Sequence, residues 1–186
     1  RSLVQYPVRG GRWLNVVAIV HGQVQGDMSH WDHSANAQDL RRNMADTCLP
    51  LQDLVGAIGQ WRLWPLSIRP PMGGAHEHAK GRVALLGDAA HPMVPYLAQG
   101  AGMAIEDASV LAQELFDNDG GQARTVQERL GRYAQRRWQR NAQVQARAIR
   151  NGEIFHATGL MRMGRNLAMR LMGEKLLDQP WLYGGG

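Results

Sequence analysis

The stretch that decides the fold runs from residue 81 to residue 108 and reads GRVALLGDAAHPMVPYLAQGAGMAIEDA. Its first part, Arg82–Leu86, is a short and nearly all-apolar run that ends at Gly87 and Asp88. Such a run, closed by turn residues, is typical of a strand that is buried on both faces. The sequence therefore predicts a buried strand with a carboxylate at its carboxyl end.

The segment that follows cannot be regular, because Pro92 and Pro95 exclude both a helix interior and a central strand. A helix is predicted from Met103 to Phe116, directly after a glycine-rich entry. Glu106 and Asp107 fall early in this helix, where we expect them to favour the positive end of its dipole. The apolar positions at helical spacing are Ile105, Ala108, Leu111, Ala112 and Leu115.

A strand, an irregular loop and a glycine-rich helix start together suggest a ligand site. In open α/β sheets ligands lie at the carboxyl ends of strands, where Asp88 stands and could accept hydrogen bonds from sugar-like hydroxyls. Gly100 and Gly102 let the backbone approach a ligand, and the helix start presents free N–H groups to negative charge. The alternative is a simple turn that bears an aspartate and leads into a helix.

The residues before this stretch are rich in predicted strands. Leu3–Val8 and Arg12–Val20 form a hairpin with a turn at Gly10-Gly11. Asp32–Ile58 is predicted to be mainly helical with a break at Pro50.

Towards the end of the chain the pattern is helical. Trp61–Leu66 is a further short strand and Ile68–Lys80 a loop. A long helix begins near Val126, with apolar residues four apart, and helical segments at Ile154–Met163 and Leu167–Leu177 close the chain.

The composition is that of a globular protein. Of 186 residues, 44% are hydrophobic and 20% charged, and the apolar runs are much shorter than the roughly 20 residues of a spanning helix. The single cysteine, Cys48, excludes an intramolecular disulfide framework and indicates a reducing cytoplasm. We expect it to be a small buried hydrophobic residue. The methionines Met161, Met163, Met169 and Met172 are expected in core packing or a dimer contact, with a partner surface or a membrane contact as the alternatives.

The chain is basic, with a formal net charge of +5. Eight arginines lie between Ala123 and Arg150, where Glu128 is the sole acid. Such a stripe could bind phosphates or nucleic acid, but no nucleic-acid motif accompanies it. We interpret it as a solvated helix face that also pairs with acids elsewhere.

The decisive stretch resembles the second FAD-binding motif of the single-component flavoprotein aromatic hydroxylases, above all the branch of salicylate hydroxylase and 3-hydroxybenzoate 6-hydroxylase. The match is ungapped over about thirty positions, which makes it a specific signal. Further resemblance to the family is carried by Tyr6-Pro7 with Gly10-Gly11-Arg12, by Trp64-Pro65-Leu66 with Arg69-Pro70, and by Tyr133, Arg136 and Arg137.

The resemblance implies an α/β fold, the C-terminal part of a p-hydroxybenzoate-hydroxylase-like FAD-binding fold. Residues 1–75 would be the remainder of a substrate domain, 76–121 the piece of the FAD domain with the Gly-Asp motif, and 122–186 the C-terminal helices. The family's GxGxxG unit is absent, since Ile105 replaces its third glycine. The chain thus resembles only a C-terminal half, and we expect an upstream nucleotide-binding half as a partner.

The resemblance also implies roles for individual residues. Asp88 would bond the ribityl hydroxyls of FAD, and Pro92 and Pro95 would form a wall at the flavin. Tyr96 would lie near the aromatic substrate, and His91 would either transfer a proton or brace the loop. The cofactor-binding residues implied are Gly87, Asp88, Pro92, Pro95, Gly100, Ala101, Gly102, Met103 and Ala104.

The implied function is an FAD-dependent monooxygenase that hydroxylates a small phenolic or aromatic acid with NADH or NADPH and O₂, through a flavin C4a-hydroperoxide. The alternatives are a flavin-dependent hydroxylase or reductase of another substrate class, and a non-catalytic basic helical binding fragment. Tyr6 and His21 are further candidates for a phenol-activating base, although each is more often an ordinary sheet residue. We predict no metal site, no nucleic-acid or membrane partner, and a homodimer as one arrangement; this half alone should bind FAD weakly or not at all.

Overall fold

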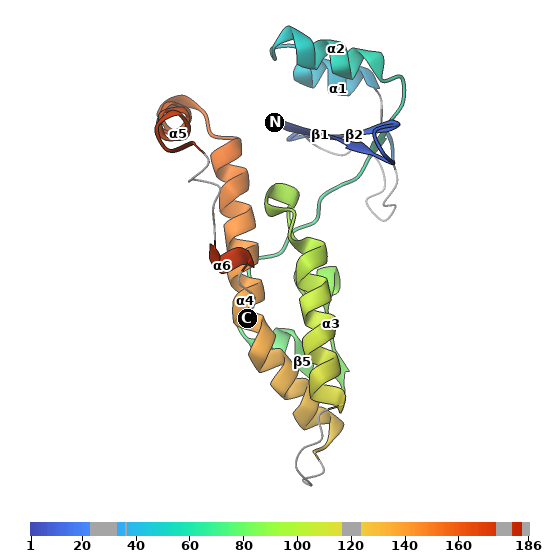
Figure 1. Cartoon of the computed structure of the whole chain (residues 1–186), viewed down its shortest axis with the longest axis vertical. Coiled ribbons are helices and arrows are strands. Elements are labelled where there is room, and N and C mark those ends of the chain that lie inside the picture. Colours follow the sequence, from blue (N-terminus) through green and yellow to red (C-terminus); the bar gives the residue numbers. More distant parts are fainter. Residues whose placement is uncertain (23–32, 36, 117–123, 174–179, 184–186) are drawn as a thin grey trace. The chain divides into compact units, whose positions relative to one another are not determined.

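The computed structural model describes residues 1–22, 33–35, 37–116, 124–173 and 180–183. The chain divides into two compact units, Arg1–Leu66 and Ser67–Gly186 (Figure 1). The two units are described separately below. The three-part division at residues 75 and 121 stays a prediction.

The first unit opens with the predicted hairpin. Strand β1, Ser2–Val8, pairs antiparallel with β2, Trp13–Ile19, and Val8 lies opposite Trp13. The turn needs a left-handed backbone, with φ of 67° at Gly10 and 83° at Gly11, which glycine adopts without steric cost. The hairpin prediction is confirmed.

The rest of the first unit is a pair of helices and a short sheet. Strand β3, His33–Ala35, pairs antiparallel with β4, Trp61–Leu63. Between them lie α1, Ala37–Met44, and α2, Leu49–Ala57.

The predicted break of the helical segment is present but lies at residues 45–48, just before Pro50. Pro50 occupies the first turn of α2, where its missing N–H has no helical partner to lose. One expectation for this unit is wrong. Cys48 is exposed, because it is the residue that precedes α2 and not part of its packed face. Met44 and Val55 are buried where α1 and α2 pack together.

The second unit begins with a 3₁₀ turn, η1, Ala75–Glu77, and a two-stranded ladder. Strand β5, Ala79–Lys80, pairs antiparallel with β6, Val83–Ala84. The prediction of a strand buried on both faces is wrong for this chain, since Val83 is 65% exposed. Among the described residues β6 pairs only with β5, and Ala84 is half-buried while Val83 stays exposed.

Two helices form the body of the second unit. Helix α3, Gly100–Phe116, packs along α4, Val126–Phe155 (Figure 1). Helix α4 begins at a capping box, in which Thr125 and Glu128 satisfy each other's backbone N–H groups. The sequence predicts these helices, but α3 starts at Gly100, earlier than expected.

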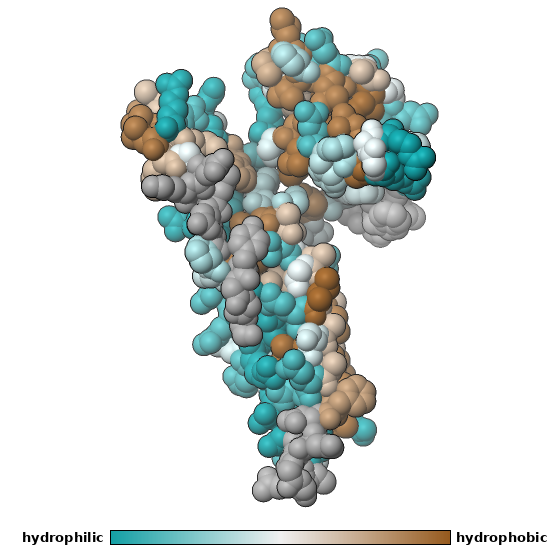
Figure 2. Space-filling view, viewed as in Figure 1, coloured by the Kyte–Doolittle hydropathy of each residue, from teal (hydrophilic) through white to brown (hydrophobic). Residues whose placement is uncertain are grey.

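The buried face of α3 is not the expected apolar one. Ile105 is 71% exposed, whereas Met103, Asp107 and Glu114 are buried. Apolar side chains follow the outer edge of α3 (Figure 2). Asp107 faces the neighbouring helix instead of serving the helix dipole, because it finds charged partners there.

Two short helices end the described chain: α5, Gly159–Met172, and α6, Pro180–Tyr183. The break between α4 and α5 lies at residues 156–158, inside the predicted segment Ile154–Met163, and α5 runs through the predicted gap at residues 164–166. The backbone enters a left-handed conformation at Gly159 (φ 57°). Leu182 of α6 is buried against Met103 and Val144. The methionines of α5 are exposed, so packing in a core of this chain is wrong for them. No helix in the described segments is long and apolar enough to cross a membrane.

Candidate functional site

The Gly-Asp motif forms a tight 3₁₀ turn, η2, Gly87–Ala89, directly after β6. Gly87 has a φ of 57°, and a Cβ added there would lie 3.1 Å from the Cβ of Ala104. Glycine is therefore required both by the backbone conformation and by the close approach of the turn to α3. Small residues at both positions bring the turn against the start of that helix.

The Asp88 side chain is exposed and lies beside the N-terminus of α3. A Cβ added at Gly100 would be 3.8 Å from its Oδ1. Among the described residues no group donates a hydrogen bond to this carboxylate. The carboxylate is thus available to a ligand.

The first backbone amides of α3 complete this corner. The amide of Met103 bonds the carbonyl of Gln99, so the amides of Gly100, Ala101 and Gly102 come before the first such bond. Amides at this position lack intrahelical acceptors and carry the positive end of the helix dipole. An acceptor carboxylate and free N–H donors side by side suit a ligand with hydroxyls and an electron-rich edge.

The proline loop holds Tyr96 against α4. Pro95 starts the 3₁₀ turn η3, Pro95–Leu97, and Ala98 follows with a left-handed φ of 53°. The Tyr96 ring is seated on Gly152, where an added Cβ would be 2.6 Å from ring atom Cε2. Phe155 also contacts this ring, and His156 Nε2 lies 3.5 Å from its hydroxyl.

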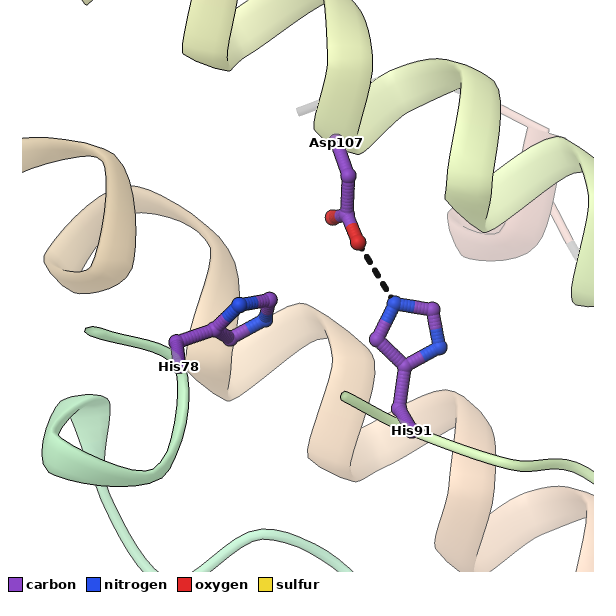
Figure 3. Close-up of side chains that lie close together, drawn as sticks. All are labelled: His78, His91 and Asp107. Atoms are coloured by element: carbon purple, nitrogen blue, oxygen red, sulfur yellow. Dashed lines mark hydrogen bonds and ion pairs between the residues drawn. The ribbon is translucent and has the colours of Figure 1, made fainter. Parts of the chain in front are cut away.

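A buried carboxylate lies behind the turn. Asp107 and His91 are fully buried, and His91 Nε2 lies 2.6 Å from Asp107 Oδ2 (Figure 3). The same oxygen accepts the Gly87 amide at 3.1 Å. The other oxygen accepts Arg137 Nε at 2.8 Å and Asn141 Nδ2 at 2.9 Å. Asp107 therefore joins α3, the Gly-Asp turn, the proline loop and α4.

A second group of bonds holds Leu85, two residues before the turn. The carbonyl of Leu85 accepts the Tyr133 hydroxyl at 2.9 Å and lies 3.1 Å from His78 Nδ1. His78 Nε2 lies 2.8 Å from Asn141 Nδ2. Because the amide of Asn141 can only donate from nitrogen, His78 accepts at Nε2 and donates from Nδ1. His78 is thus neutral in this arrangement.

The pKa shifts agree with these roles. Burial alone would raise the pKa of Asp107, but hydrogen bonds from His91, Asn141, Arg137 and Gly87 outweigh it and hold the pKa well below its usual 3.8. Burial lowers the pKa of His78 from its usual 6.5. Asp107 is ionised and His78 neutral near pH 7.

His78, His91 and Asp107 bring ligand atoms to within 4.8 Å of one another, a spacing that a metal ion could use. Both oxygens of Asp107 are already occupied by four N–H donors, among them the Arg137 guanidinium. A metal cation would face that guanidinium at close range. The cluster is better described as a hydrogen-bonded brace.

The arginine stripe of α4 turns towards the acids of α3. Glu114 accepts Arg132 at 2.6 Å and Arg136 at 2.9 Å. Glu106 accepts Arg137 at 2.8 Å and Arg140 at 2.7 Å. The expectation that this stripe pairs with acids elsewhere is confirmed for these arginines.

The structure brings together most of the residues expected at the site: Gly87, Asp88, Gly100, Ala101, Gly102, Met103 and Ala104. The Met103 side chain is buried in the core, so only its backbone faces this corner. His91 lies behind the turn. Tyr6, which is 48% exposed on β1, and His21, after β2, belong to the first unit.

Sequence reasoning missed His78, Asn141 and the structural role of Asp107. One signal was available: Asp107 and Arg137 are opposite charges within two consecutive predicted helices.

Comparison with known proteins identifies the class. A family model described as "FAD binding domain" matches residues 16–148, and the chain belongs to this family. It is 34% identical to 3-hydroxybenzoate 6-hydroxylase 2 of Aquipseudomonas alcaligenes, over 98% of this chain and 55% of that protein. It is 33% identical to 3-hydroxybenzoate 6-hydroxylase of Polaromonas naphthalenivorans, over 98% of this chain and 44% of that protein. The resemblance seen in residues 81–108 is confirmed.

Solved structures agree on the fold. A salicylate hydroxylase substrate complex superposes with a TM-score of 0.76 and 25% identity over 99% of this chain and 44% of that one. Klebsiella pneumoniae HpxO, in complex with FAD and uric acid, gives 0.65 and 25% over 89% and 39%. The predicted p-hydroxybenzoate-hydroxylase-like α/β fold is confirmed, and the chain spans about half the length of these relatives.

The residues present fit FAD. With glycine at 87 and alanine at 104, only the Ala104 methyl group lies between the turn and α3. The exposed Asp88 carboxylate matches the hydroxyl-rich ribityl chain, and the amides of 100–102 match the electron-rich pyrimidine edge.

Proposed function

We propose that this chain supplies the flavin-binding turn and part of the substrate domain of an FAD-dependent monooxygenase. The enzyme would hydroxylate a small phenolic or aromatic acid with NADH or NADPH and O₂. The observation that carries the proposal is the exposed Asp88 carboxylate beside the first amides of α3. Bound FAD would supply the redox chemistry that activates oxygen.

The chain's own residues bind and orient the cofactor. Asp88 accepts hydrogen bonds from ribityl hydroxyls, and the amides of Gly100, Ala101 and Gly102 favour negative charge on the flavin. Pro92 and Pro95 keep the loop rigid at the flavin. This corner would help to exclude water from the reacting atoms.

The two catalytic candidates take different parts in the proposal. Tyr96 is held by Gly152 and by the ring of Phe155, which would fix its hydroxyl near the substrate side. His91 is buried and bonded to Asp107, which favours bracing over proton transfer.

The proposed substrate is inferred from the names of the relatives, and the proposed partner from exposed apolar residues. Names such as 3-hydroxybenzoate 6-hydroxylase and salicylate hydroxylase favour a hydroxybenzoate as substrate. The exposed apolar residues Val83 and Ile105 favour contact with further protein, which the resemblance identifies as the nucleotide-binding half. A homodimer is the other arrangement. The single cysteine favours the cytoplasm.

The test is a substrate titration at saturating FAD, in which the chain is combined with a nucleotide-binding half and the flavin absorption spectrum is followed. We expect 3-hydroxybenzoate or salicylate to perturb the spectrum and cyclohexanecarboxylate, which has a carboxylate but no aromatic ring, to leave it unchanged. Oxygen uptake with NADH and with NADPH then measures coupled turnover. Equal responses to the aromatic and the saturated acid would contradict the proposed substrate class.

A further inference from the structure

We propose that Asp107 and Tyr133 are positioning residues for the flavin-binding turn: they clamp the backbone on both sides of Leu86, the residue that leads into the turn, and so set the place of Asp88. This inference rests on the proposed function, because it names what holds the site that the cofactor would use. It assigns the polar cluster behind the turn a role in affinity for FAD.

Side-chain hydrogen bonds hold the entry to the turn, where strand pairing within this chain is short. A turn at the end of a strand is normally held by neighbouring strands, but among the described residues β6 pairs only with the two-residue β5. The carbonyl of Leu85 and the amide of Gly87 instead bond to side chains. These two groups flank the one residue, Leu86, that leads into the turn.

The side chains of the clamp are themselves fixed. Asp107, Asn141 and Tyr133 are fully buried, and Arg137 is 3% exposed. Arg137 donates to Asp107 at 2.8 Å and to Asn141 Oδ1 at 3.1 Å, so the carboxylate cannot turn without breaking these bonds. The side chains of α4 therefore fix the place of the turn, because the hydrogen bonds that link them to it have defined donor directions.

His91 adds a third point of attachment. Its ring donates to the same Asp107 oxygen that accepts Gly87, from the far side of the turn. The Gly87 amide at the start of the turn and the His91 ring just after it therefore bond the same oxygen of Asp107. Movement of that oxygen would displace both ends of the segment that carries Asp88.

Glu114 offers a matched control. It is also a buried acid of α3 that pairs with arginine on α4, in its case Arg132 and Arg136, but it contacts neither the turn nor Leu85. If Asp107 serves only to join α3 to α4, the two acids are equivalent. If it positions the turn, only Asp107 matters for Asp88.

The experiment compares Asp107→Asn, Tyr133→Phe and Glu114→Gln in the 186-residue chain. Asparagine offers one oxygen to four donors, so at least one buried N–H loses its acceptor. Amide hydrogen exchange at Gly87 and Asp88 is measured by NMR, and FAD affinity by titration of the same samples. Asp88→Ala serves as the control for the flavin site.

We expect Asp107→Asn to speed exchange at Gly87 and to weaken FAD binding, each by about tenfold or more. Tyr133→Phe keeps the hydrogen bonds between Asp107 and α4, and it should change the exchange rate and the FAD affinity by about two- to tenfold each. It serves in place of Asp107→Asn if that variant does not fold. Glu114→Gln should lower the melting temperature and leave both readouts unchanged. These results would support the clamp.

Two outcomes overturn it: unchanged exchange and affinity in Asp107→Asn and Tyr133→Phe, or equal changes in Glu114→Gln. Failure of the proposed function looks different. In that case Asp88→Ala binds FAD as the unmodified chain does, while the exchange at Gly87 still shows whether the backbone is clamped.

Discussion

Replacement of Asp107 by alanine should destabilise the second unit more than any other single loss of charge in it. The substitution leaves Arg137 buried, with 4% of its side chain exposed, and removes the carboxylate that neutralises it at 2.8 Å. Breaking a buried ion pair from one side costs about 3–5 kcal/mol of unfolding free energy. Arg137 keeps Glu106 as a partner, so we expect about 3–4 kcal/mol.

The same substitution at Glu114 gives the loss of unfolding free energy with which the loss at Asp107 is compared. Its partners Arg132 and Arg136 have side chains 48% and 47% exposed, so water solvates them when the carboxylate is lost. Exposed ion pairs contribute about 0–1 kcal/mol, and we expect a loss of about 1 kcal/mol. The two acids lie on one helix and pair with one neighbouring helix, which makes the comparison a matched one.

Urea unfolding followed by circular dichroism measures both values. The double variant Asp107→Ala/Arg137→Met should be more stable than Asp107→Ala alone, because it no longer buries an unpaired charge. A loss at Asp107 within about 1 kcal/mol of the loss at Glu114 would refute the reasoning. So would a double variant less stable than the single one.

Three further predictions concern other parts of the chain. Burial lowers the pKa of His78 from 6.5, so as the pH falls the unfolded chain binds a proton at His78 before the folded chain does. The free energy of unfolding, measured in urea, should therefore fall as the pH drops below about 6.5. His78→Gln should make this dependence of stability on pH less steep. Gly152→Ala should lower the melting temperature by displacing the Tyr96 ring, and should have almost no effect in a Tyr96→Ala background. Thr125→Ala removes the capping box with Glu128 and should cost about 1 kcal/mol in the same urea assay, whereas an unchanged value would show that the cap is not formed in solution.

Local patterns in the sequence were sufficient where local chemistry decides the structure. The hairpin at Gly10-Gly11 needs only a pair of β-forming runs and two residues that tolerate positive φ. The turn at Gly87-Asp88 and the helix after it follow from the prolines and glycines of one continuous stretch. The family resemblance lies in that same stretch.

Sequence patterns failed where the burial of a residue depends on which side chain lies opposite it. The spacing of Ile105 with Ala108 predicts a buried apolar face on α3, but the face that packs on α4 carries Asp107 and Glu114. A charged residue is buried there only because Arg137 lies opposite, and single-sequence periodicity does not show which charges meet. For the same reason the role of His78 was not foreseen, since its side-chain partner Asn141 lies 63 residues away in the sequence.

The measurement that tests the central claim most directly is a flavin titration of the chain by NMR, with FAD, FMN and ADP as separate ligands. FAD and FMN, which share the ribityl chain, should perturb the same amides between residues 87 and 104, and ADP should not. Asp88→Ala should weaken both flavins by about tenfold or more, because a charge-assisted hydrogen bond is lost, while Glu153→Ala, which removes an exposed acid on α4, should not. Equal flavin affinity in Asp88→Ala, or the same perturbations with ADP, would contradict the account.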